Sequence, residues 1–147
     1  MSGCASRKQM QKGFTLIEVM VVIVILGILS ALIVPNIIHK AGDARVAAAK
    51  SDLAAIGQAL DMYKLDNSSY PTSDQGLQAL VKKPSGSPEP RNWNPSGYLK
   101  KLPLDPWHRE YAYTSPAEGA AYEIRTLGAD GREGGEGEDQ DLSSLNL

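Results

Sequence analysis

The longest apolar stretch of the chain begins at Phe14 and continues to about Ile38, with a single ionisable residue, Glu18, inside it. As a helix, these roughly 25 residues would extend about 37 Å, which is enough to cross the ~30 Å hydrocarbon layer of a bilayer. Residues 14–38 are therefore predicted to form a transmembrane helix. A carboxylate in the bilayer costs about 2.5–3.5 kcal/mol on insertion scales, so Glu18 requires a compensating partner. A cation on a neighbouring copy of the chain is the nearest candidate.

The leader before this stretch, residues 1–13, carries three basic residues and no acid. By the positive-inside rule the leader is cytoplasmic and the rest of the chain lies on the other side of the membrane. An ordinary secretory signal, cleaved near Ser30 and Ala31, is the alternative, although the apolar run continues past these residues. For Glu18 the alternative to charge pairing is a side chain that reaches to the membrane surface.

A second helical pattern extends from Asp43 to Asp66. Its apolar residues recur at steps of three and four, which places them on one face of a helix. The stripe consists of Val46, Ala49, Leu53, Ile56, Leu60 and Tyr63. If both patterns join, residues 14–66 form one helix about 80 Å long. A globular core of this size cannot cover such a helix, so lipid or other copies must cover its first half.

The remainder of the chain predicts a short helix and a hairpin. Thr72 and Gln75 have the spacing of a capping box, and residues 111–114 and 122–126 have the pattern of two paired strands. The predicted fold class is α+β, with a long N-terminal helix packed on a small antiparallel sheet. The predicted organisation is a leader over residues 1–13, the apolar helix, and a folded domain over residues 39–147.

Charge and cysteine content exclude several function classes. The chain of 147 residues has a net charge of -2, and loss of the basic leader would change it to -5, which argues against nucleic-acid binding. The only cysteine, Cys4, lies in the leader, so the chain after residue 13 has no thiol for catalysis or a metal site. His39 and His108 lie near no plausible nucleophile in sequence, and no catalytic motif is present. We therefore predict that the protein is not an enzyme.

An acidic, glycine-rich segment occupies residues 127–141 and contains six acids and one base, Arg132. Clustered carboxylates repel one another unless a cation joins them, and Ca²⁺ accepts 6–8 oxygen ligands at about 2.3–2.6 Å, backbone carbonyls included. The spacing does not match an EF-hand loop. From the residues alone, a calcium site and a disordered acidic tail both remain open.

Residues 12–18, Lys-Gly-Phe-Thr-Leu-Ile-Glu, resemble the class III signal of type IV pilins and pseudopilins. The resemblance implies that a prepilin peptidase cleaves between Gly13 and Phe14 on the cytoplasmic side and methylates the new N-terminus of Phe14. It also implies that Glu18 is the acid at the fifth position of the processed chain. The new α-amino group would then be neutralised by Glu18 of an adjacent subunit, a pair that acts mainly as a register device during assembly.

Several later stretches narrow the resemblance to the major pseudopilin of type II secretion, the G-type subunit. These stretches are LDMYKLDN (60–67), YPT (70–72), QGLQAL (75–80), GYL (97–99), LPLDPW (102–107) and LGADG (127–131). The resemblance implies a type IV pilin-like fold and an inner-membrane protein whose C-terminal domain lies in the periplasm. It implies a homopolymer, a short periplasmic pseudopilus, that helps move folded exoproteins across the outer membrane. Minor pseudopilins and an inner-membrane assembly platform are the implied partners.

The same resemblance favours calcium in the acidic segment. It implies that the Leu127 carbonyl and Asp130 supply the early ligands, and that Asp139, Asp141 and a carbonyl near Glu138 supply the later ones. One departure concerns the last six residues, which contain no aromatic residue, whereas members of the family often have a tryptophan there.

Two other interpretations compete with a secretion pseudopilin. A type IV pilin for adhesion, motility or DNA uptake usually carries a C-terminal disulfide loop, which a chain without cysteine after residue 13 cannot form. A signal-anchored periplasmic enzyme or calcium-binding module predicts an uncleaved leader or cleavage after the apolar run.

Overall fold

One long helix provides the framework of the protein. The computed structural model describes residues 12–147, and the side chains of all of them except residues 33–39. Helix α1 comprises Leu16–Asn67. Thr15 precedes it, and its carbonyl and hydroxyl oxygens accept hydrogen bonds from the Glu18 amide at 3.1 and 3.3 Å. Thr15 thus satisfies an amide that the first turn leaves without a helical partner. The predicted joining of the two helical patterns into one helix is confirmed.

Helix α1 ends at Asn67 with a recognisable C-terminal cap. Ser68 adopts a left-handed conformation with φ of 67°, and its amide donates to the Lys64 carbonyl at 2.7 Å. The Asn67 side chain donates to the Tyr63 carbonyl at 3.0 Å. The Ser68 bond satisfies a carbonyl of the last turn that has no donor within the helix, and the Asn67 side chain adds a second hydrogen bond there.

The chain divides into two compact units, one before Lys40 and the other over Lys40–Leu147. In the first unit, every large apolar side chain described between Leu16 and Leu32 is at least 45% exposed. Among the described residues, no helix combines the length and apolar character that crossing a membrane requires. The side chains of residues 33–39 lie outside the described part, and the transmembrane span over residues 14–38 stays a prediction.

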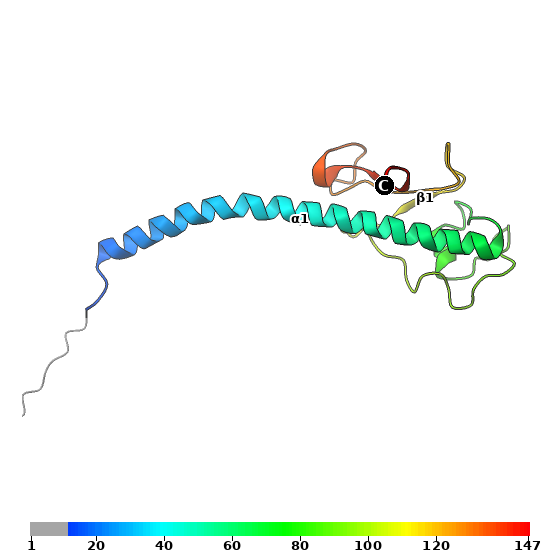
Figure 1. The fold of residues 1–147 in the computed structure, drawn as a ribbon, viewed down its shortest axis with the longest axis horizontal. Helices are drawn as coiled ribbons and strands as arrows, with labels where there is room; N and C mark the ends of the chain where they lie inside the picture. Colours follow the sequence, from blue (N-terminus) through cyan, green and yellow to red (C-terminus); the bar gives the residue numbers. More distant parts are fainter. Residues whose placement is uncertain (1–11) are drawn as a thin grey trace, which may run out of the picture. The chain divides into compact units, whose positions relative to one another are not determined.

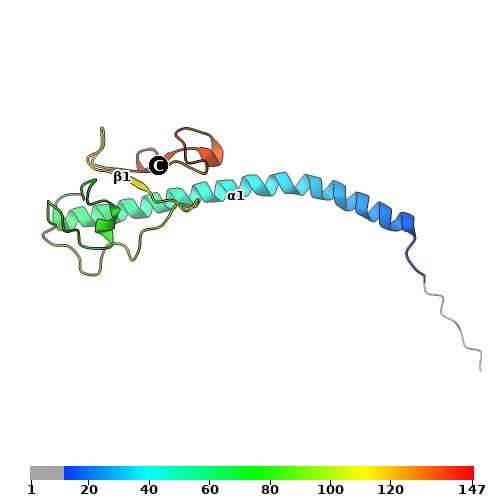
Figure 2. The same cartoon turned by 180° about the vertical axis from the view of Figure 1, so that it is seen from behind.

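In the second unit, a three-stranded antiparallel sheet lies beside the C-terminal half of α1 (Figure 1, Figure 2). The strands are β1 (Ala112–Thr114), β2 (Glu123–Thr126) and β3 (Leu142–Ser143), in the order β1-β2-β3. Tyr113 pairs with Ile124, and Thr126 pairs with Leu142. The predicted hairpin is confirmed, with each strand beginning one residue later than expected. Strand β3 was not predicted, because two residues are too few to show an alternating pattern.

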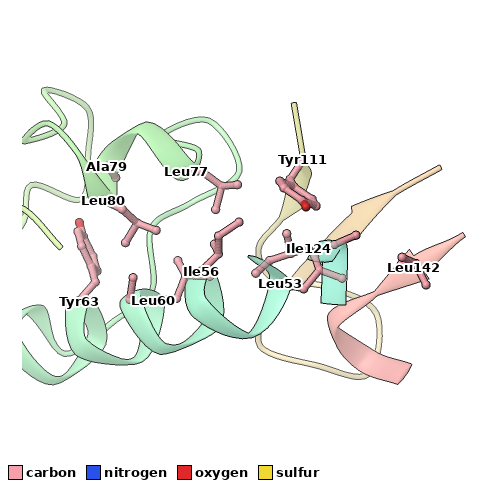
Figure 3. Close-up of a cluster of buried hydrophobic side chains, with 12 residues drawn as sticks. Leu53, Ile56, Leu60, Tyr63, Leu77, Ala79, Leu80, Tyr111, Ile124 and Leu142 are labelled. Atoms are coloured by element: carbon pink, nitrogen blue, oxygen red, sulfur yellow. The ribbon is translucent and has the colours of Figure 1, made fainter. Parts of the chain in front are cut away.

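The hydrophobic core forms where the predicted stripe of α1 meets the sheet and a short 3-10 helix, η1 (Leu77–Leu80). Leu53, Ile56 and Leu60 are completely buried. Figure 3 shows these side chains facing the residues contributed by η1, the strand region and the C-terminal segment. Those residues are Leu77, Ala79, Leu80, Tyr111, Ile124 and Leu142. Of the stripe, only Val46 is less than fully buried. The predicted α+β class is confirmed.

The predicted capping box forms, but the helix after it is shorter than expected. The Thr72 amide donates to Gln75 Oε1 at 3.1 Å, and the Gln75 amide donates to Thr72 Oγ1 at 3.3 Å. These reciprocal bonds close a turn before Gly76, whose φ of 63° interrupts the helical path. The helix that follows is therefore a single 3-10 turn, η1, in which Leu77 and Leu80 are buried.

Candidate functional site

The predicted cleavage point lies in an open, non-helical segment before α1. Gly13 and Phe14 are both exposed, Phe14 at 84%, and no heavy atom lies within 4 Å of a side-chain position at Gly13. Residues 1–11 of the predicted leader lie outside the described residues. The Gly13–Phe14 peptide bond is thus accessible within the part of the leader that the structure describes.

The predicted assembly residue, Glu18, lies in the first turn of α1 and is exposed. A negative charge at this end of a helix is favoured by the helix dipole. Among the ion pairs of the described residues, none includes Glu18. Its position leaves the carboxylate available to a partner outside the chain.

The acidic segment, residues 127–141, connects β2 to β3 and folds back on itself. The peptide after Asp139 lies against two glycines: a Cβ atom at Gly128 would be 2.7 Å from the Asp139 carbonyl carbon, and one at Gly135 would overlap the Asp139 carbonyl oxygen. Both glycines also have positive φ, 69° and 94°. Only residues without a Cβ permit this close approach, so the glycines let the start and end of the loop meet.

Arg109 holds the start of the loop. Its guanidinium donates to the Gly128 carbonyl at 2.6 Å and to the Ala129 carbonyl at 2.7 Å. Arg109 is in turn held by Asp105, which is 2% exposed. Asp105 Oδ1 accepts from the Arg109 amide at 2.8 Å, and its other oxygen accepts from the Thr126 hydroxyl. The loop is therefore attached to the end of β2 by a buried carboxylate and an arginine.

Glu138 holds the end of the loop, within the 3-10 turn η2 (Gly137–Asp139). Its Oε1 accepts from Arg45 Nη1 at 2.7 Å and from Trp107 Nε1 at 3.1 Å. These hydrogen bonds, with Arg45 contributing most, hold the pKa of Glu138 below its usual value. The side chain of Glu138 is therefore committed to the protein. The prediction that the carbonyl near Glu138 binds a metal stays a prediction.

The other predicted ligands differ in their surroundings. Asp130 Oδ1 accepts from the Arg132 amide at 3.0 Å, and Asp141 Oδ2 accepts from the Gly134 amide at 3.1 Å. Asp139 is exposed, and Leu127 directly follows β2. Among the described side chains, no three from His, Cys, Asp or Glu converge in an arrangement that fits a metal ion. The structure thus places the predicted acids in one loop but does not bring their carboxylates together.

One observation nevertheless matches a cation. Asp141 Oδ1 is buried and has no hydrogen-bond partner, which is costly for a carboxylate oxygen. The Glu138 carbonyl accepts one hydrogen bond, from the Ala129 amide at 3.0 Å, and a carbonyl oxygen has a second lone pair. The available donors are oxygens, which hard cations such as Ca²⁺ prefer. The donor chemistry therefore fits calcium, with backbone carbonyls completing the set.

Sequence reasoning missed the residues that anchor the loop, Arg45, Trp107 and Arg109. The Asp105-Pro106-Trp107 sequence has a turn composition, which could have indicated that Asp105 binds nearby amides. Nothing in the sequence indicates the contact of Arg45 with Glu138, because 93 positions separate the two residues.

Comparison with known families gives matches over nearly all of the chain. Residues 36–145 match the family described as type II secretion system (T2SS), protein G. Residues 8–34 match the prokaryotic N-terminal methylation motif, which includes the predicted cleavage point and Glu18.

Curated relatives and a solved structure agree with these matches. The chain is 55% identical to the type II secretion system core protein G of Pseudomonas aeruginosa, over 94% of this chain and 97% of the relative. It is also 55% identical to the protein of that name from Vibrio cholerae, over 93% of each chain. The fold is similar to the crystal structure of the major pseudopilin from the type 2 secretion system of enterohaemorrhagic Escherichia coli. In that comparison the TM-score is 0.67 and the identity 41%, over 77% of this chain and 96% of the other.

Proposed function

Because the chain belongs to the family of type II secretion system protein G, we propose that it polymerises into the periplasmic pseudopilus of such a system. In this role it is the major structural subunit of the fibre, and it drives export of folded proteins across the outer membrane. The alternative of a type IV pilin for adhesion, motility or DNA uptake is not favoured by the relatives. A structural role requires no active site, and we propose that the protein is not an enzyme.

The uncovered apolar surface of α1 is the observation that carries this proposal. From Leu16 to Leu32 the large apolar side chains are exposed all around the helix. Contiguous apolar surface of this extent marks a membrane or protein contact, and its burial stabilises by about 25 cal/mol per Å². We propose that the inner membrane covers this surface before assembly and that α1 helices of sister subunits cover it in the fibre.

The proposed partners follow from this path. A prepilin peptidase processes the chain, an inner-membrane assembly platform with minor pseudopilins organises the fibre, and exoproteins are its cargo. The C-terminal unit lies in the periplasm. Nucleic acid is not a proposed partner, because the net charge of -2 disfavours phosphate binding.

Leader processing is the first step to test. We propose cleavage between Gly13 and Phe14 and methylation of the new Phe14 amine, supported by the motif match and the exposure of this segment. N-terminal sequencing and mass spectrometry of protein co-produced with a prepilin peptidase should give methylated phenylalanine. Gly13→Leu should leave the leader attached. A mature N-terminus after Ala31 would instead establish an ordinary signal peptide.

Charge pairing by Glu18 is the proposed register device. A carboxylate among apolar helices is stable only beside a cation, and the processed amine of a sister subunit provides one. Glu18→Ala should reduce sheared or pelleted fibre at least tenfold while membrane insertion is unchanged. Asp43→Ala, a change of an exposed acid on the same helix, is the matched control. Equal fibre yield from Glu18→Ala and Asp43→Ala would refute pairing.

Calcium is the proposed ion of the acidic loop. The unpartnered Asp141 oxygen and the oxygen-rich surroundings support it. The ligands would be Asp130, Asp139, Asp141 and the carbonyls of Leu127 and Glu138. Bound calcium would neutralise the acids and join the loop to the sheet.

Calcium removal provides the test. Chelation should lower the thermal midpoint of the full-length protein by several degrees, and calcium but not magnesium should restore it. Asp141→Asn should lower the midpoint in calcium and abolish the response to chelation. An unchanged midpoint on chelation, with no calcium found by elemental analysis, would leave the acidic loop without an ion.

A further inference from the structure

Three segments that are distant in sequence meet at one carboxylate oxygen. Glu138 Oε1 in the acidic loop accepts from Arg45 Nη1 of α1 at 2.7 Å and from Trp107 Nε1 at 3.1 Å. The side chain of Glu138 is 30% exposed and that of Arg45 is 52% exposed. An exposed ion pair stabilises a fold by only about 0–1 kcal/mol. The contact therefore matters less for stability than for the position in which it holds Glu138 against α1.

The surface of α1 is shaped to receive the glutamate. Gly42 lies three residues before Arg45, about one helical turn away. A Cβ atom at Gly42 would be 3.0 Å from Glu138 Oε2 and 3.4 Å from its Cδ. Gly42 is itself buried. The missing side chain thus lets the carboxylate lie directly against the helix, with Arg45 beside it.

The same residue contributes a fixed carbonyl to the loop. The Glu138 carbonyl accepts from the Ala129 amide at 3.0 Å, and the peptide after Asp139 lies against Gly128 and Gly135. The side chain of Glu138 therefore points to α1, while its main chain closes the loop. A displacement of the side chain moves the peptide that the loop closes on.

We propose that Arg45 and Trp107 are positioning residues for calcium, acting through the side chain of Glu138. This inference rests on the proposed calcium function of the loop. The glutamate side chain is an anchor on α1 and not a metal ligand, and it orients the carbonyl of residue 138 before calcium binds. Residues that orient metal ligands from outside the ligand set affect affinity by about 10–100-fold. The affinity for calcium therefore depends on how the loop is positioned on α1.

The test is a calcium titration of the full-length protein in detergent by calorimetry. Arg45→Met keeps the length of the side chain and removes the ion pair, and it should raise the calcium Kd about tenfold. It should also shift Trp107 emission in the calcium-free protein, since the indole loses its fixed partner. The emission of Trp107→Phe, which comes from Trp93 alone, shows which part of the wild-type spectrum belongs to Trp107. Arg45→Lys, which can still donate to Oε1, should restore most of the affinity.

A charge-matched control separates positioning from simple electrostatics. Arg125→Met removes another arginine paired with an acid of the same loop, Glu133, at 3.2 Å. Loss of a nearby positive charge alone would tighten calcium binding in both variants. Positioning predicts weaker binding for Arg45→Met only. Equal or tighter binding by Arg45→Met would overturn the proposal.

Glu138→Gln provides a second route if Arg45→Met folds poorly. The amide keeps an oxygen acceptor for Trp107 but lacks the charge that pairs with Arg45, so a rise in Kd larger than that of Glu133→Gln, which removes a charge from the same loop, supports the proposal, and an equal rise overturns it. A wild-type Kd for Glu138→Gln overturns it. If the wild type binds calcium and no variant changes the Kd, the positioning role is refuted while the calcium function stands. A wild-type protein that binds no calcium refutes the calcium function and, with it, this role.

Discussion

The two halves of α1 contain similar apolar residues, but these are exposed in the first half and mostly buried in the second. Leu26 is 57% exposed and Leu53 is fully buried, although both lie in the same helix. From residue 16 to 32 apolar side chains occur on every side, whereas from residue 43 onward the buried ones form one stripe, and only Met62 and Leu65 are large apolar side chains exposed in the described part of that half. A stripe can be covered by one small sheet, but a helix that is apolar all around needs cover from every direction. The distribution of leucines, more than their number, determines whether the chain covers its own helix.

The two halves of α1 therefore have different roles. The second half gives its apolar face to the core, together with η1 and the sheet. The first half exposes its apolar side chains, and we propose that contacts outside the chain cover them. Changes in the second half should therefore alter the stability of the unit Lys40–Leu147, and changes in the first half should alter assembly.

The largest expected difference is between two identical substitutions in α1. Leu53→Ala leaves a cavity in the core and should lower the free energy of unfolding by about 2–5 kcal/mol. Leu26→Ala removes an exposed side chain and should change it by less than about 0.5 kcal/mol. Urea unfolding followed by tryptophan emission reports on this unit, since Trp93 and Trp107 both lie in it. Equal losses for the two variants would contradict the division of α1.

A smaller loss in the free energy of unfolding is expected when the buried carboxylate that attaches the acidic loop, Asp105, is removed. Asp105 is 2% exposed and accepts from the Trp107 and Arg109 amides and the Thr126 hydroxyl. Asp105→Ala strands these donors and should cost about 2–3 kcal/mol in the same urea experiment.

The control for this prediction is Asp43→Ala, which changes an exposed aspartate. It should alter the free energy of unfolding by less than about 0.5 kcal/mol. A similar small effect for Asp105→Ala would mean that the loop is held without the carboxylate.

A still smaller loss of stability is expected on removing a hydrogen bond between the sheet region and the second half of α1. The Tyr111 hydroxyl donates to Asp52 Oδ2 at 3.0 Å, and burial, together with this carboxylate, raises the pKa of Tyr111. Tyr111→Phe should lower the free energy of unfolding by about 1 kcal/mol. Asp52→Asn keeps an acceptor and should retain most of the stability. A larger loss for Asp52→Asn than for Tyr111→Phe would assign Asp52 another role.

The last expected effect is absent at neutral pH and appears only in alkali. Burial, the leading cause in both residues, raises the pKa of Tyr70 and of Tyr113 to about 12. Above the ordinary tyrosine pKa of about 10, the unfolded chain loses these protons before the folded chain does. Their contribution to stability is therefore complete below about pH 10 and declines as the pH rises toward 12. Tyrosinate absorbance should show late-titrating groups in the folded protein only, and ionisation of all tyrosines near pH 10 would contradict this.

The sequence predicted those parts of the fold that depend on local periodicity. The stripe from Ala49 to Tyr63 was correct because contacts three and four residues apart determine which face of a helix is apolar. The hairpin was correct because its two strands are close in sequence. Strand β3 was missed because it consists of two residues whose pairing with Arg125 and Thr126 depends on the path of the acidic loop.

The candidate sites divide in the same way. Gly13, Phe14 and Glu18 are identified by a contiguous motif, so the sequence suffices to name them, and their roles stay predictions. The acidic loop could be identified from composition, but its anchoring by Arg45 and Arg109 could not, because those contacts link distant segments. The sequence names a carbonyl near Glu138 as a ligand, and it gives no sign that the Glu138 carboxylate pairs with Arg45.

The single buried stripe of α1 has a consequence for how the gene can vary. Where the helix meets the core, tolerated substitutions should recur with the helical period, strict at Leu53 or Ile56 and permissive one residue away at exposed positions. Before residue 33, where the large apolar side chains described are all exposed, one aliphatic side chain should replace another at almost any site. A saturation library screened for secretion would trace the transition from uniform to periodic tolerance along one continuous helix.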